Sequence, residues 1–419
     1  MKRFAVLLLT LALAVCCTLP AFAADTIEVN EDVSVSGDYD WTRFKGQNIT
    51  LNVYNWGEYI SNGSDDSLDV VSAFEDLTGI KVNYTTFDSN ESMYAKLKNG
   101  GITVDVVIPS DYMIGRMRQE GMLQELNYDN IPNAQYIDDA YRGLSFDPED
   151  KYSVPYTWGT VGIIYNTKYV DEADVTGWEL LWNEKYADKI LMFDNSRDAF
   201  GIAEYLLGYD VNTTDEAELK ACADKLAEQK PVVQQYVMDQ IFDAMENEEA
   251  YIAPYYAGDY LTMVEENEDL AFYRPAHQGY NVFIDAMCIP KGCQNKEGAE
   301  AFINFLCRPD ISAANLDYIG YSTPETAAKD YLDEEVTSSP VSYPDDETLA
   351  RSESFAELGV EATQVMNDLW LSVKTSTSNT TLYLILTIAA IAAVILFFVI
   401  SGIVRRRKKA RRCRKWKQA

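Results

Sequence analysis

Aromatic residues stand beside carboxylates at several points of this chain, each time close to a short apolar run. Trp56, Glu58 and Tyr59 follow one such run at residues 49–54. A similar mixture, with amide and hydroxyl groups added, recurs at Ser110 and Tyr112, Asn195 and Asp198, Tyr256 and Asp259, and Phe283 and Asp285. Together these residue types can hold positive charges and cover apolar stems.

A ligand that carries ammonium groups on a hydrocarbon chain needs this mixture of side chains. Each buried ammonium requires a carboxylate partner, because burial of an unpaired charge is very costly. An aromatic ring over the ammonium adds about 0.5–2 kcal/mol through cation–π attraction. Taken singly, each cluster is better explained by core packing or by solvated loops, since the chain has 28 tyrosines. The clusters form a site only if the fold brings them together.

The residues that most enzymes use are missing from the sequence. His277 is the single histidine, and its neighbours offer no partner for a catalytic triad. The sequence contains no H-E-x-x-H, P-loop or G-x-G-x-x-G motif. We therefore expect a protein that is not an enzyme and that uses no cofactor and no metal ion.

The cysteines in the body of the chain do not have the C-x-x-C spacing of zinc sites. They are Cys222, Cys288, Cys293 and Cys307. Buried free thiols and disulfides are equal alternatives for them. Cys288 with Cys293 is the pairing to test first.

Strand-like and helix-like segments alternate along the chain. Residues 49–54, 80–87 and 105–108 are expected as strands, and residues 67–77 and 89–97 have helical periodicity. This alternation predicts α/β lobes with parallel sheets. Ligands of such sheets bind at the carboxyl ends of the strands, so a site is expected in the loops that follow them.

One helix start is predicted from a local motif. Thr213 and Glu216 have the spacing of a capping box, in which each side chain bonds to the backbone of the other residue. The helix that follows is expected to bury Leu219, Cys222, Ala223 and Leu226.

The two ends of the chain have the composition of targeting segments. Basic residues, an apolar run and small residues predict a signal peptide over residues 1–23. Residues 382–404 carry no charge, and a helix of this length would rise about 34 Å, enough to cross a membrane. The tail, residues 405–419, holds ten Lys and Arg. We therefore expect one membrane span, with a cytoplasmic tail and an extracellular or periplasmic body.

The body of the chain is long and acidic. Without the signal peptide and the tail, 23 basic residues face 66 acidic ones, a net charge of about −43. This charge argues against nucleic acid as a partner. Residues 48–372 exceed what one core usually holds, so two lobes are expected there. Residues 24–47 are predicted to be an acidic linker and residues 373–381 a flexible stalk.

Short fragments in a fixed order carry a resemblance that spans nearly the whole body. They are residues 51–60 (LNVYNWGEYI), 78–82, 89–97, 107–110, 154–159, 295–299, 303–310 and 319–324. In order and spacing they resemble the spermidine/putrescine-binding proteins of bacterial ABC importers, which are extracellular solute-binding proteins.

This resemblance implies an α/β clamp of the two-lobed periplasmic-binding-protein (Venus-flytrap) type, with hinge crossovers and a polyamine between the lobes. Lobe 1 would comprise about residues 48–155 and 283–330, and lobe 2 about residues 156–282 and 331–372. Carried over by position, the ligand contacts fall on Trp56, Glu58, Tyr59, Ser110, Tyr112, Asn195, Asp198, Tyr256, Asp259, Phe283, Asp285 and Tyr321. The aromatic residues would form walls, and Asp198, Asp259 and Asp285 would receive ammonium groups.

The chain also departs from the family pattern. Asn195 stands where spermidine-type members carry an aspartate, and Tyr256 and Phe283 replace tryptophans. No residue near Phe355 matches a glutamine that the family has close to its C-terminus. Polyamine binding is still expected, but the choice among polyamines stays open.

The resemblance further implies a monomeric receptor that closes on its ligand and delivers it to the permease subunits of an ABC transporter. Two alternatives remain at this stage. Tyr255 and Tyr256 resemble the tyrosine doublet of ferric-ion receptors of related fold. A sensor ectodomain is the other alternative, although it would need a partner, because the short tail leaves no room for a signalling domain.

Overall fold

The computed structural model describes residues 26–29, 33–37, 39–375, 387–389, 391–392 and 396. Its strands are β1 (Thr26–Glu28), β2 (Ser34–Ser36), β3 (Thr50–Trp56), β4 (Lys81–Phe87), β5 (Val106–Val107), β6 (Ser153–Asn166), β7 (Ile190–Phe193), β8 (Val233–Val237), β9 (Ile252–Tyr256), β10 (Leu270–Tyr273), β11 (Tyr280–Cys288) and β12 (Ser352–Glu353).

The α-helices pack around the sheet that most of these strands form. They are α2 (Val70–Thr78), α3 (Asn90–Lys98), α4 (Asp111–Gln119), α5 (Ser196–Leu207), α6 (Glu216–Gln229), α7 (Ile241–Glu246), α8 (Ala257–Glu266), α9 (Lys296–Leu306), α10 (Pro309–Ile319), α11 (Thr326–Lys329), α12 (Glu334–Thr337), α13 (Asp346–Leu349) and α14 (Gly359–Thr375).

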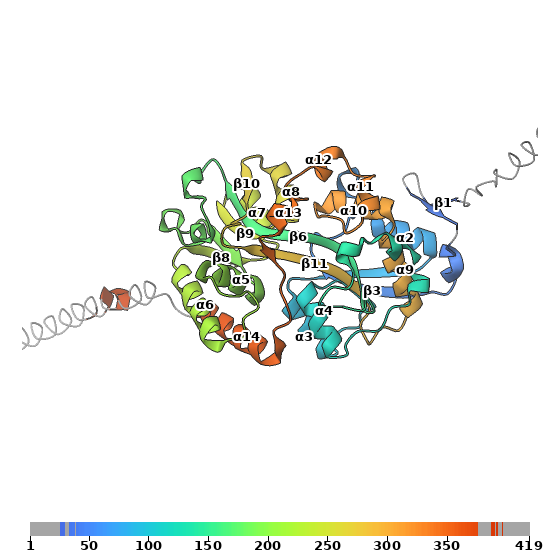
Figure 1. Ribbon diagram of the computed structural model, residues 1–419, viewed down its shortest axis with the longest axis horizontal. Helices are drawn as coiled ribbons and strands as arrows, with labels where there is room; N and C mark the ends of the chain where they lie inside the picture. Colours follow the sequence, from blue (N-terminus) through green and yellow to red (C-terminus); the bar gives the residue numbers. More distant parts are fainter. Residues whose placement is uncertain are drawn as a thin grey trace, which may run out of the picture.

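Two long strands join the two halves of the sheet. The strand order is β4-β3-β5-β11-β6-β9-β7-β8. In addition, β10 pairs with β6, and β12 pairs with β11. The first part of β6 pairs with β11, and its last part pairs with β9 and β10. Figure 1 shows β6 and β11 running through the middle of the molecule, from the side of β3, α2 and α9 to the side of β8 and α5. We call the β4-β3-β5 side the first half and the β9-β7-β8 side the second half.

The expectation of purely parallel sheets is only partly met. β3 runs parallel to β4 and β5, and β7 runs parallel to β8 and β9. β6 and β11, however, are antiparallel to each other and to their neighbours β9 and β5. The local alternation of strands and helices gave the parallel parts correctly, but it carried no information about strands that cross from one half to the other.

Most predicted helix ends follow from local capping. The Asp69 side chain accepts a hydrogen bond from the Ser72 N–H at the start of α2, and Gly79 ends this helix with a φ of 74°. The predicted capping box at Thr213 is wrong. The α6 cap is Asp215, whose side chain accepts from the backbone of Ala217 and Glu218. An aspartate directly before the first turn replaces the capping box, and the four residues expected to be buried are buried.

The segment before β3 is packed and not a free linker. Trp41 and Phe44 are 2% and 3% exposed, and the Trp41 ring meets Phe305 edge-on at 5.9 Å. Val33 and Val35 are buried as well. The acidic composition of residues 24–47 concealed these few apolar anchors, which bind the N-terminal segment to the core of the first half.

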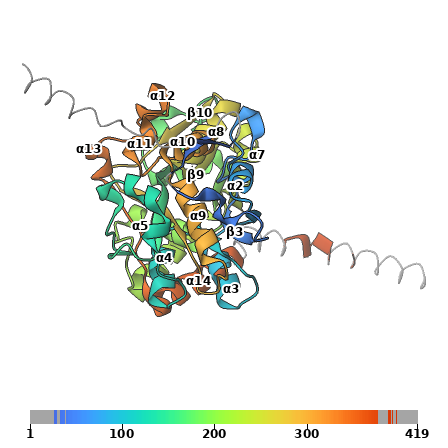
Figure 2. The ribbon, with the colours of Figure 1, turned by 90° about the vertical axis from the view of Figure 1, so that its right-hand side faces the viewer.

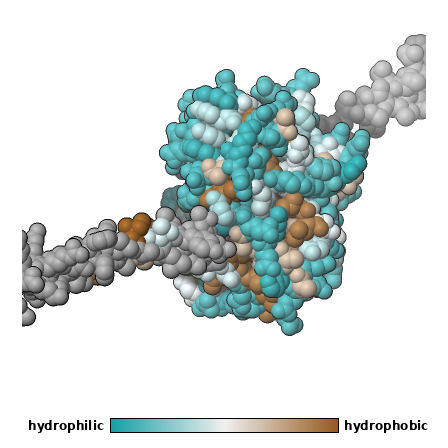
Figure 3. Space-filling model, turned by 90° about the vertical axis from the view of Figure 1, so that its left-hand side faces the viewer, coloured by the Kyte–Doolittle hydropathy of each residue, from teal (hydrophilic) through white to brown (hydrophobic). Residues whose placement is uncertain are grey.

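Helices lie on both sides of the two central strands, β6 and β11. In both ribbon views α10, α11 and α12 lie at the top, and α3, α4 and α14 lie at the bottom (Figures 1 and 2). The face at the α6 end carries many hydrophilic residues, as the acidic composition leads one to expect, with hydrophobic patches among them (Figure 3). Inside, rings such as Phe74 and Phe302 pack edge-to-face at 5.1 Å with no exposed surface.

Two further predictions concern the thiols and the membrane. Cys222, Cys288, Cys293 and Cys307 are all buried free thiols, so the Cys288–Cys293 pairing is not formed. Within the ranges given above, no helix has the length and apolar composition needed to cross a membrane. The span expected over residues 382–404 falls almost entirely outside those ranges, as do the signal peptide and the basic tail.

Candidate functional site

A cavity lies between the two halves of the sheet and collects most of the residues singled out in the sequence. It holds about 700 Å³ of space not occupied by atoms, part of it open to solvent. Its lining residues are Trp56, Gly57, Tyr59, Ser89, Asn90, Glu91, Ser110, Asp111, Tyr112, Asn195, Asp198, Met238, Asp239, Phe242, Tyr255, Tyr256, Asp259, Asn281, Phe283, Asp285, Tyr321 and Phe355. All the predicted contact residues except Glu58 are among them.

Strand ends and helix starts position most of these side chains. Trp56 ends β3 and Tyr59 lies in the loop after it. Ser110 and Asn195 precede the first residues of α4 and α5, where Asn195 caps α5 by accepting from the Asp198 N–H. Asp259 lies in the first turn of α8, directly after β9. The site is therefore built at the carboxyl ends of strands from both halves, as expected for an α/β sheet.

Besides Trp56, three of the predicted residues lie in strands and not in loops. Tyr256 is the last residue of β9, and Phe283 and Asp285 lie inside β11. The pairing of β11 with β6 shifts register between Asp285 and Ala286. Bulges of this kind are frequent beside binding sites, where they redirect a side chain. Here the irregular strand places Asp285 in the lining of the cavity.

Tyrosine hydroxyls donate hydrogen bonds to four carboxylates of the cavity. Each pair brings together residues that are far apart in the sequence or on separate elements. The pairs are Tyr59 with Asp285 at 2.6 Å, Tyr256 with Asp198 at 2.8 Å, Tyr321 with Asp259 at 3.0 Å and Tyr112 with Glu91 at 3.0 Å. We call them the tyrosine–carboxylate pairs. They fix each carboxylate in the wall and leave it able to accept from a ligand.

Burial raises the pKa of the cavity carboxyl groups. The pKa of Asp285 rises to about 6, because burial and the Asp198 charge outweigh the opposing effect of the Ser110 and Tyr59 hydroxyls. Burial likewise raises the pKa of Asp111 to about 8. The pKa of Asp259 lies well above its usual value, again mainly because of burial. In the ligand-free protein, negative charge at this site is therefore unfavourable.

No basic side chain compensates these charges in the lining itself. Of the described residues, those around the cavity include the carboxylates of Glu91, Asp111, Asp198, Asp239, Asp259 and Asp285 but no Lys, Arg or His. Oδ1 of Asp285 is buried and receives no hydrogen bond from the part of the chain that the structure describes. Such a cavity attracts a ligand that brings its own positive charges.

Aromatic rings line the cavity between the carboxylates. Tyr256 meets Phe283 at 5.3 Å, and Phe283 meets Tyr321 at 6.2 Å, both in edge-on geometry. Tyr59 continues the series at 4.7 Å from Tyr321. Ring faces between charged groups suit a ligand in which apolar spacers separate the positive charges.

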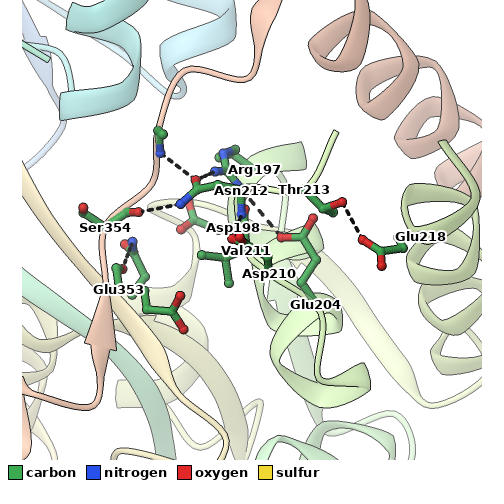
Figure 4. Close-up of polar contacts among 12 residues, drawn as sticks. Arg197, Asp198, Glu204, Asp210, Val211, Asn212, Thr213, Glu218, Glu353 and Ser354 are labelled. Carbon is green, nitrogen blue, oxygen red and sulfur yellow. Dashed lines mark hydrogen bonds and ion pairs between the residues drawn. The ribbon is translucent and has the colours of Figure 1, made fainter. Parts of the chain in front are cut away.

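Arg197 lies just behind this wall and is held away from the cavity. Its guanidinium donates to the Val211 carbonyl and to Asn212 Oδ1, each at 2.8 Å, and lies 3.8 Å from Glu204 (Figure 4). Asn212 in turn donates to the Ser354 carbonyl at 3.1 Å. This positive charge near the cavity is thereby bound to partners of its own.

Phe355 stands between Arg197 and the cavity. The Arg197 guanidinium carbon lies 3.9 Å from the centre of the Phe355 ring. Asn212 Oδ1 also accepts from the Ala356 N–H at 2.7 Å, so Asn212 holds the backbone on both sides of Phe355. A Cβ on Gly201 would lie 2.7 Å from the tip of the ring. A side chain at position 201 of α5 would therefore clash with the Phe355 ring, and glycine avoids this clash.

The loop after β3 approaches the second half of the molecule closely. A Cβ on Gly57 would lie 2.2 Å from Oδ2 of Asp239, which follows β8. Glu58, next in the loop, adopts a φ of 47° and does not line the cavity, unlike the other predicted contacts. Gly57 thus permits a direct contact across the cavity that a larger residue would obstruct.

Several lining residues were missed by the sequence analysis. Glu91 lies in the first turn of α3, and Asp239 follows the end of β8. Asp111 was not assigned either, Tyr255 was named only for the ferric-ion alternative, and Phe355 was named only as a departure from the family pattern. The rule that ligands bind at strand ends would have found Asp239, had β8 been recognised as a strand.

An acidic cavity between two halves of an α/β sheet, joined by crossing strands, defines a solute-binding receptor. Residues 69–344 match the family of bacterial extracellular solute-binding proteins. The spermidine/putrescine-binding periplasmic protein of Escherichia coli strain K12 is 35% identical over 328 residues, 78% of this chain and 92% of that protein. The chain therefore belongs to the family of bacterial extracellular solute-binding proteins.

Solved structures agree with this assignment. A candidate spermidine/putrescine ABC transporter protein of Listeria monocytogenes is 40% identical, with a TM-score of 0.73, over 78% of this chain and 99% of that chain. The spermidine/putrescine substrate-binding protein PotD of Streptococcus pneumoniae is 39% identical, with a TM-score of 0.64, over 78% and 98%. The predicted resemblance and the two-lobed α/β fold are confirmed. Membership in a family of extracellular receptors also confirms that the protein is not an enzyme.

Proposed function

We propose that this protein is a receptor for polyamines of the spermidine and putrescine class that supplies an ABC importer. The observation that carries the proposal is the cavity itself, in which six carboxylates and a series of rings meet without a basic side chain among the described lining residues. Relatives and neighbours of similar sequence are named for the binding or transport of spermidine and putrescine, which supports the same ligand class.

The predicted contact residues then have distinct roles. Asp198, Asp259 and Asp285 receive ammonium groups, and their tyrosine partners orient them. Trp56, Tyr59, Tyr112, Tyr256, Phe283 and Tyr321 cover the methylene segments, and Ser110 and Asn195 add polar contacts. Glu58 lies outside the lining and acts through its charge, which adds to the larger effect of burial in raising the pKa of Asp239 and Asp259.

Closure of two lobes would retain the ligand. We take lobe 1 as about residues 48–155 and 283–330 and lobe 2 as about residues 156–282 and 331–372. We assign to the closed arrangement the approach of Gly57 to Asp239, where a Cβ on the glycine would lie 2.2 Å from Oδ2. A polycation stabilises that arrangement because it bridges carboxylates from both halves, which is the differential affinity that a change of conformation requires.

Delivery follows from the two ends of the chain. A signal peptide over residues 1–23 directs export, and a helix over residues 382–404 with the basic tail 405–419 anchors a monomeric receptor in the cell membrane. Residues 373–381 are the proposed stalk, although the structure places residues 373–375 in the last turn of α14. An anchor of this kind keeps the closed receptor at high local concentration beside the permease subunits.

Isothermal titration of the purified full chain, dialysed free of bound solute, tests the ligand class. Putrescine, spermidine and spermine are compared with lysine, which carries a carboxylate that the cavity would repel. We expect one-to-one binding of at least one polyamine at micromolar or lower concentration and no binding of lysine. Absence of heat with every polyamine, from a protein that melts cooperatively, would refute the proposal.

A further inference from the structure

One of the tyrosine–carboxylate pairs has no assigned role. The resemblance gives ammonium sites to the carboxylates of three pairs, Asp198, Asp259 and Asp285. The fourth pair, Tyr112 with Glu91, has the same geometry, with the Tyr112 hydroxyl 3.0 Å from Glu91 Oε1. Asn90 Nδ2 donates to the same hydroxyl at 3.1 Å, which leaves the tyrosine proton for Glu91. The pair is therefore oriented like the other three.

Glu91 also has unused binding capacity. Its Oε2 atom is buried and receives no hydrogen bond from any described residue. Burial, the largest effect, and the charge of Asp198 raise the pKa of Glu91. Hydrogen bonds from the backbone and from Tyr112, together with the charge of Arg197, oppose this rise. A carboxylate oxygen left without a partner inside the protein is costly unless a ligand pairs with it.

Glu91 lies at one end of the cavity. It lines both the main cavity and a smaller adjoining one of about 330 Å³, whose other residues include Arg116, Arg197 and Glu357. At this end Tyr112 meets Phe355 edge-on at 6.3 Å. The Phe355 ring lies against the Arg197 guanidinium. Aromatic rings therefore separate an ammonium group beside Glu91 from that positive charge.

We call Glu91, Asp198, Asp259 and Asp285, the carboxylates of the tyrosine–carboxylate pairs, the carboxylate row. After the larger effect of burial, Asp198 raises the pKa of both Glu91 and Asp285, and Asp285 raises that of Asp259. Asp239 also raises the pKa of Asp259. The rings of Tyr59, Tyr321, Phe283 and Tyr256 contact one another in that order, so the paired Asp285, Asp259 and Asp198 lie along one wall, with Glu91 within electrostatic reach of Asp198. Several carboxylates along one wall are complementary to a ligand that carries several ammonium groups.

We propose that Glu91 is a further ammonium-binding residue, and that through it the receptor selects polyamines with three or more ammonium groups over diamines. This inference rests on the proposed function. A diamine has only two charges and pairs with two neighbouring carboxylates of the row. A triamine or tetraamine extends its last ammonium group to Oε2 of Glu91 and so gives this buried oxygen a hydrogen-bond partner.

Titration calorimetry of the full chain with putrescine, spermidine and spermine tests this selection. Glu91→Gln keeps the shape and the bond from Tyr112 but removes the charge. We expect spermidine and spermine to bind roughly 10- to 100-fold more weakly, the usual effect of losing a hydrogen bond to a charged group. Putrescine affinity should change by less than about threefold. Glu357→Gln is the matched control, because Glu357 lines only the smaller cavity, and it should leave all three affinities unchanged.

The possible outcomes separate this inference from the proposed function. If the wild type binds no polyamine, both are wrong. A second outcome is that the wild type binds spermidine, that Asp285→Asn abolishes this binding and that Glu91→Gln leaves it unchanged. In that case only the proposed role of Glu91 is wrong. Equal weakening of putrescine and spermidine by Glu91→Gln would also overturn the inference, since it would show a general change of charge. Should Glu91→Gln fail to fold, Glu91→Asp, which keeps the charge but shortens its reach, must show the same selective loss.

Discussion

Replacement of Asp285 by asparagine should make the ligand-free protein more stable while it removes ligand binding. Asp285 is 4% exposed and its Oδ1 is buried without a partner among the described residues. Burial, together with the Asp198 charge, raises its pKa to about 6 against the opposing Ser110 and Tyr59 hydroxyls. The folded protein therefore holds the ionised carboxylate less well than the unfolded chain does.

The size of the effect follows from proton linkage. The pKa rises from 3.8 to about 6 on folding. Because the folded pKa is raised, the folded protein binds the proton more tightly, so stability falls as pH rises from about 4 to about 6 and stays reduced above that. Two pKa units correspond to roughly 3 kcal/mol at neutral pH. Asparagine still accepts from Tyr59 but adds an amide that needs partners, so we expect a net gain of about 1–2 kcal/mol, or about 2–6 °C.

Scanning calorimetry of ligand-free wild type and Asp285→Asn between pH 5 and pH 8 measures this difference. The gain should be largest at neutral pH and shrink toward pH 5. Asp129→Asn, at an exposed position, is the control and should change the melting temperature little. Titration with spermidine should show at least about 100-fold weaker binding to Asp285→Asn. A lower melting temperature at pH 7, or retained affinity, would refute the idea that this carboxylate is destabilising until a cation pairs with it.

Three further results are expected. Gly57→Ala should weaken polyamine binding by about tenfold or more, because the new Cβ would lie 2.2 Å from Asp239 Oδ2. Gly292→Ala is the control and should leave binding unchanged, because a Cβ there enters open space. Unchanged affinity in both variants would argue against the close approach of Gly57 to Asp239. Spermidine affinity should fall about tenfold between pH 7 and pH 5, because Asp285 takes up a proton over this range. Titration in buffers of different ionisation enthalpy should show that protons are released on binding. An affinity that does not change with pH would contradict the raised pKa of Asp285. Phe302→Ala should lower the unfolding free energy by about 3–5 kcal/mol in urea titrations, and a loss below about 1 kcal/mol would show that the core is not packed as described.

The parts of the site governed by local sequence could be predicted. Tyr59 lies in the loop after an apolar strand and Ser110 precedes a helix at a strand end, so the strand-end rule places both residues. Asn195 is placed by ordinary capping of α5. The alternation of short apolar runs with amphipathic helices likewise gave the α/β class. At these positions a few neighbouring residues decide the backbone, and the side chain follows from it.

The remaining features depend on long-range pairing. The bond from Tyr59 to Asp285 joins residues 226 positions apart. β8 has exposed glutamines in its middle and no alternating apolar pattern, so neither the strand nor Asp239 after it could be recognised. Trp41 and Phe44 are isolated apolar residues in an acidic segment, and only the first half of the fold provides the surface that buries them. No local rule contains this information.

The charges that select the ligand should also control closure. Glu91 belongs to the first half of the molecule and Asp198 to the second, and each half brings further carboxylates to the cavity. Approach of the halves without a cation removes water from these like charges and raises the free energy of the closed state. A polycation reverses this effect because it pairs with carboxylates of both halves at once. A longer polyamine engages more of the row, so it should stabilise closure more than a diamine does, and affinity and closure should rise together with the number of ammonium groups.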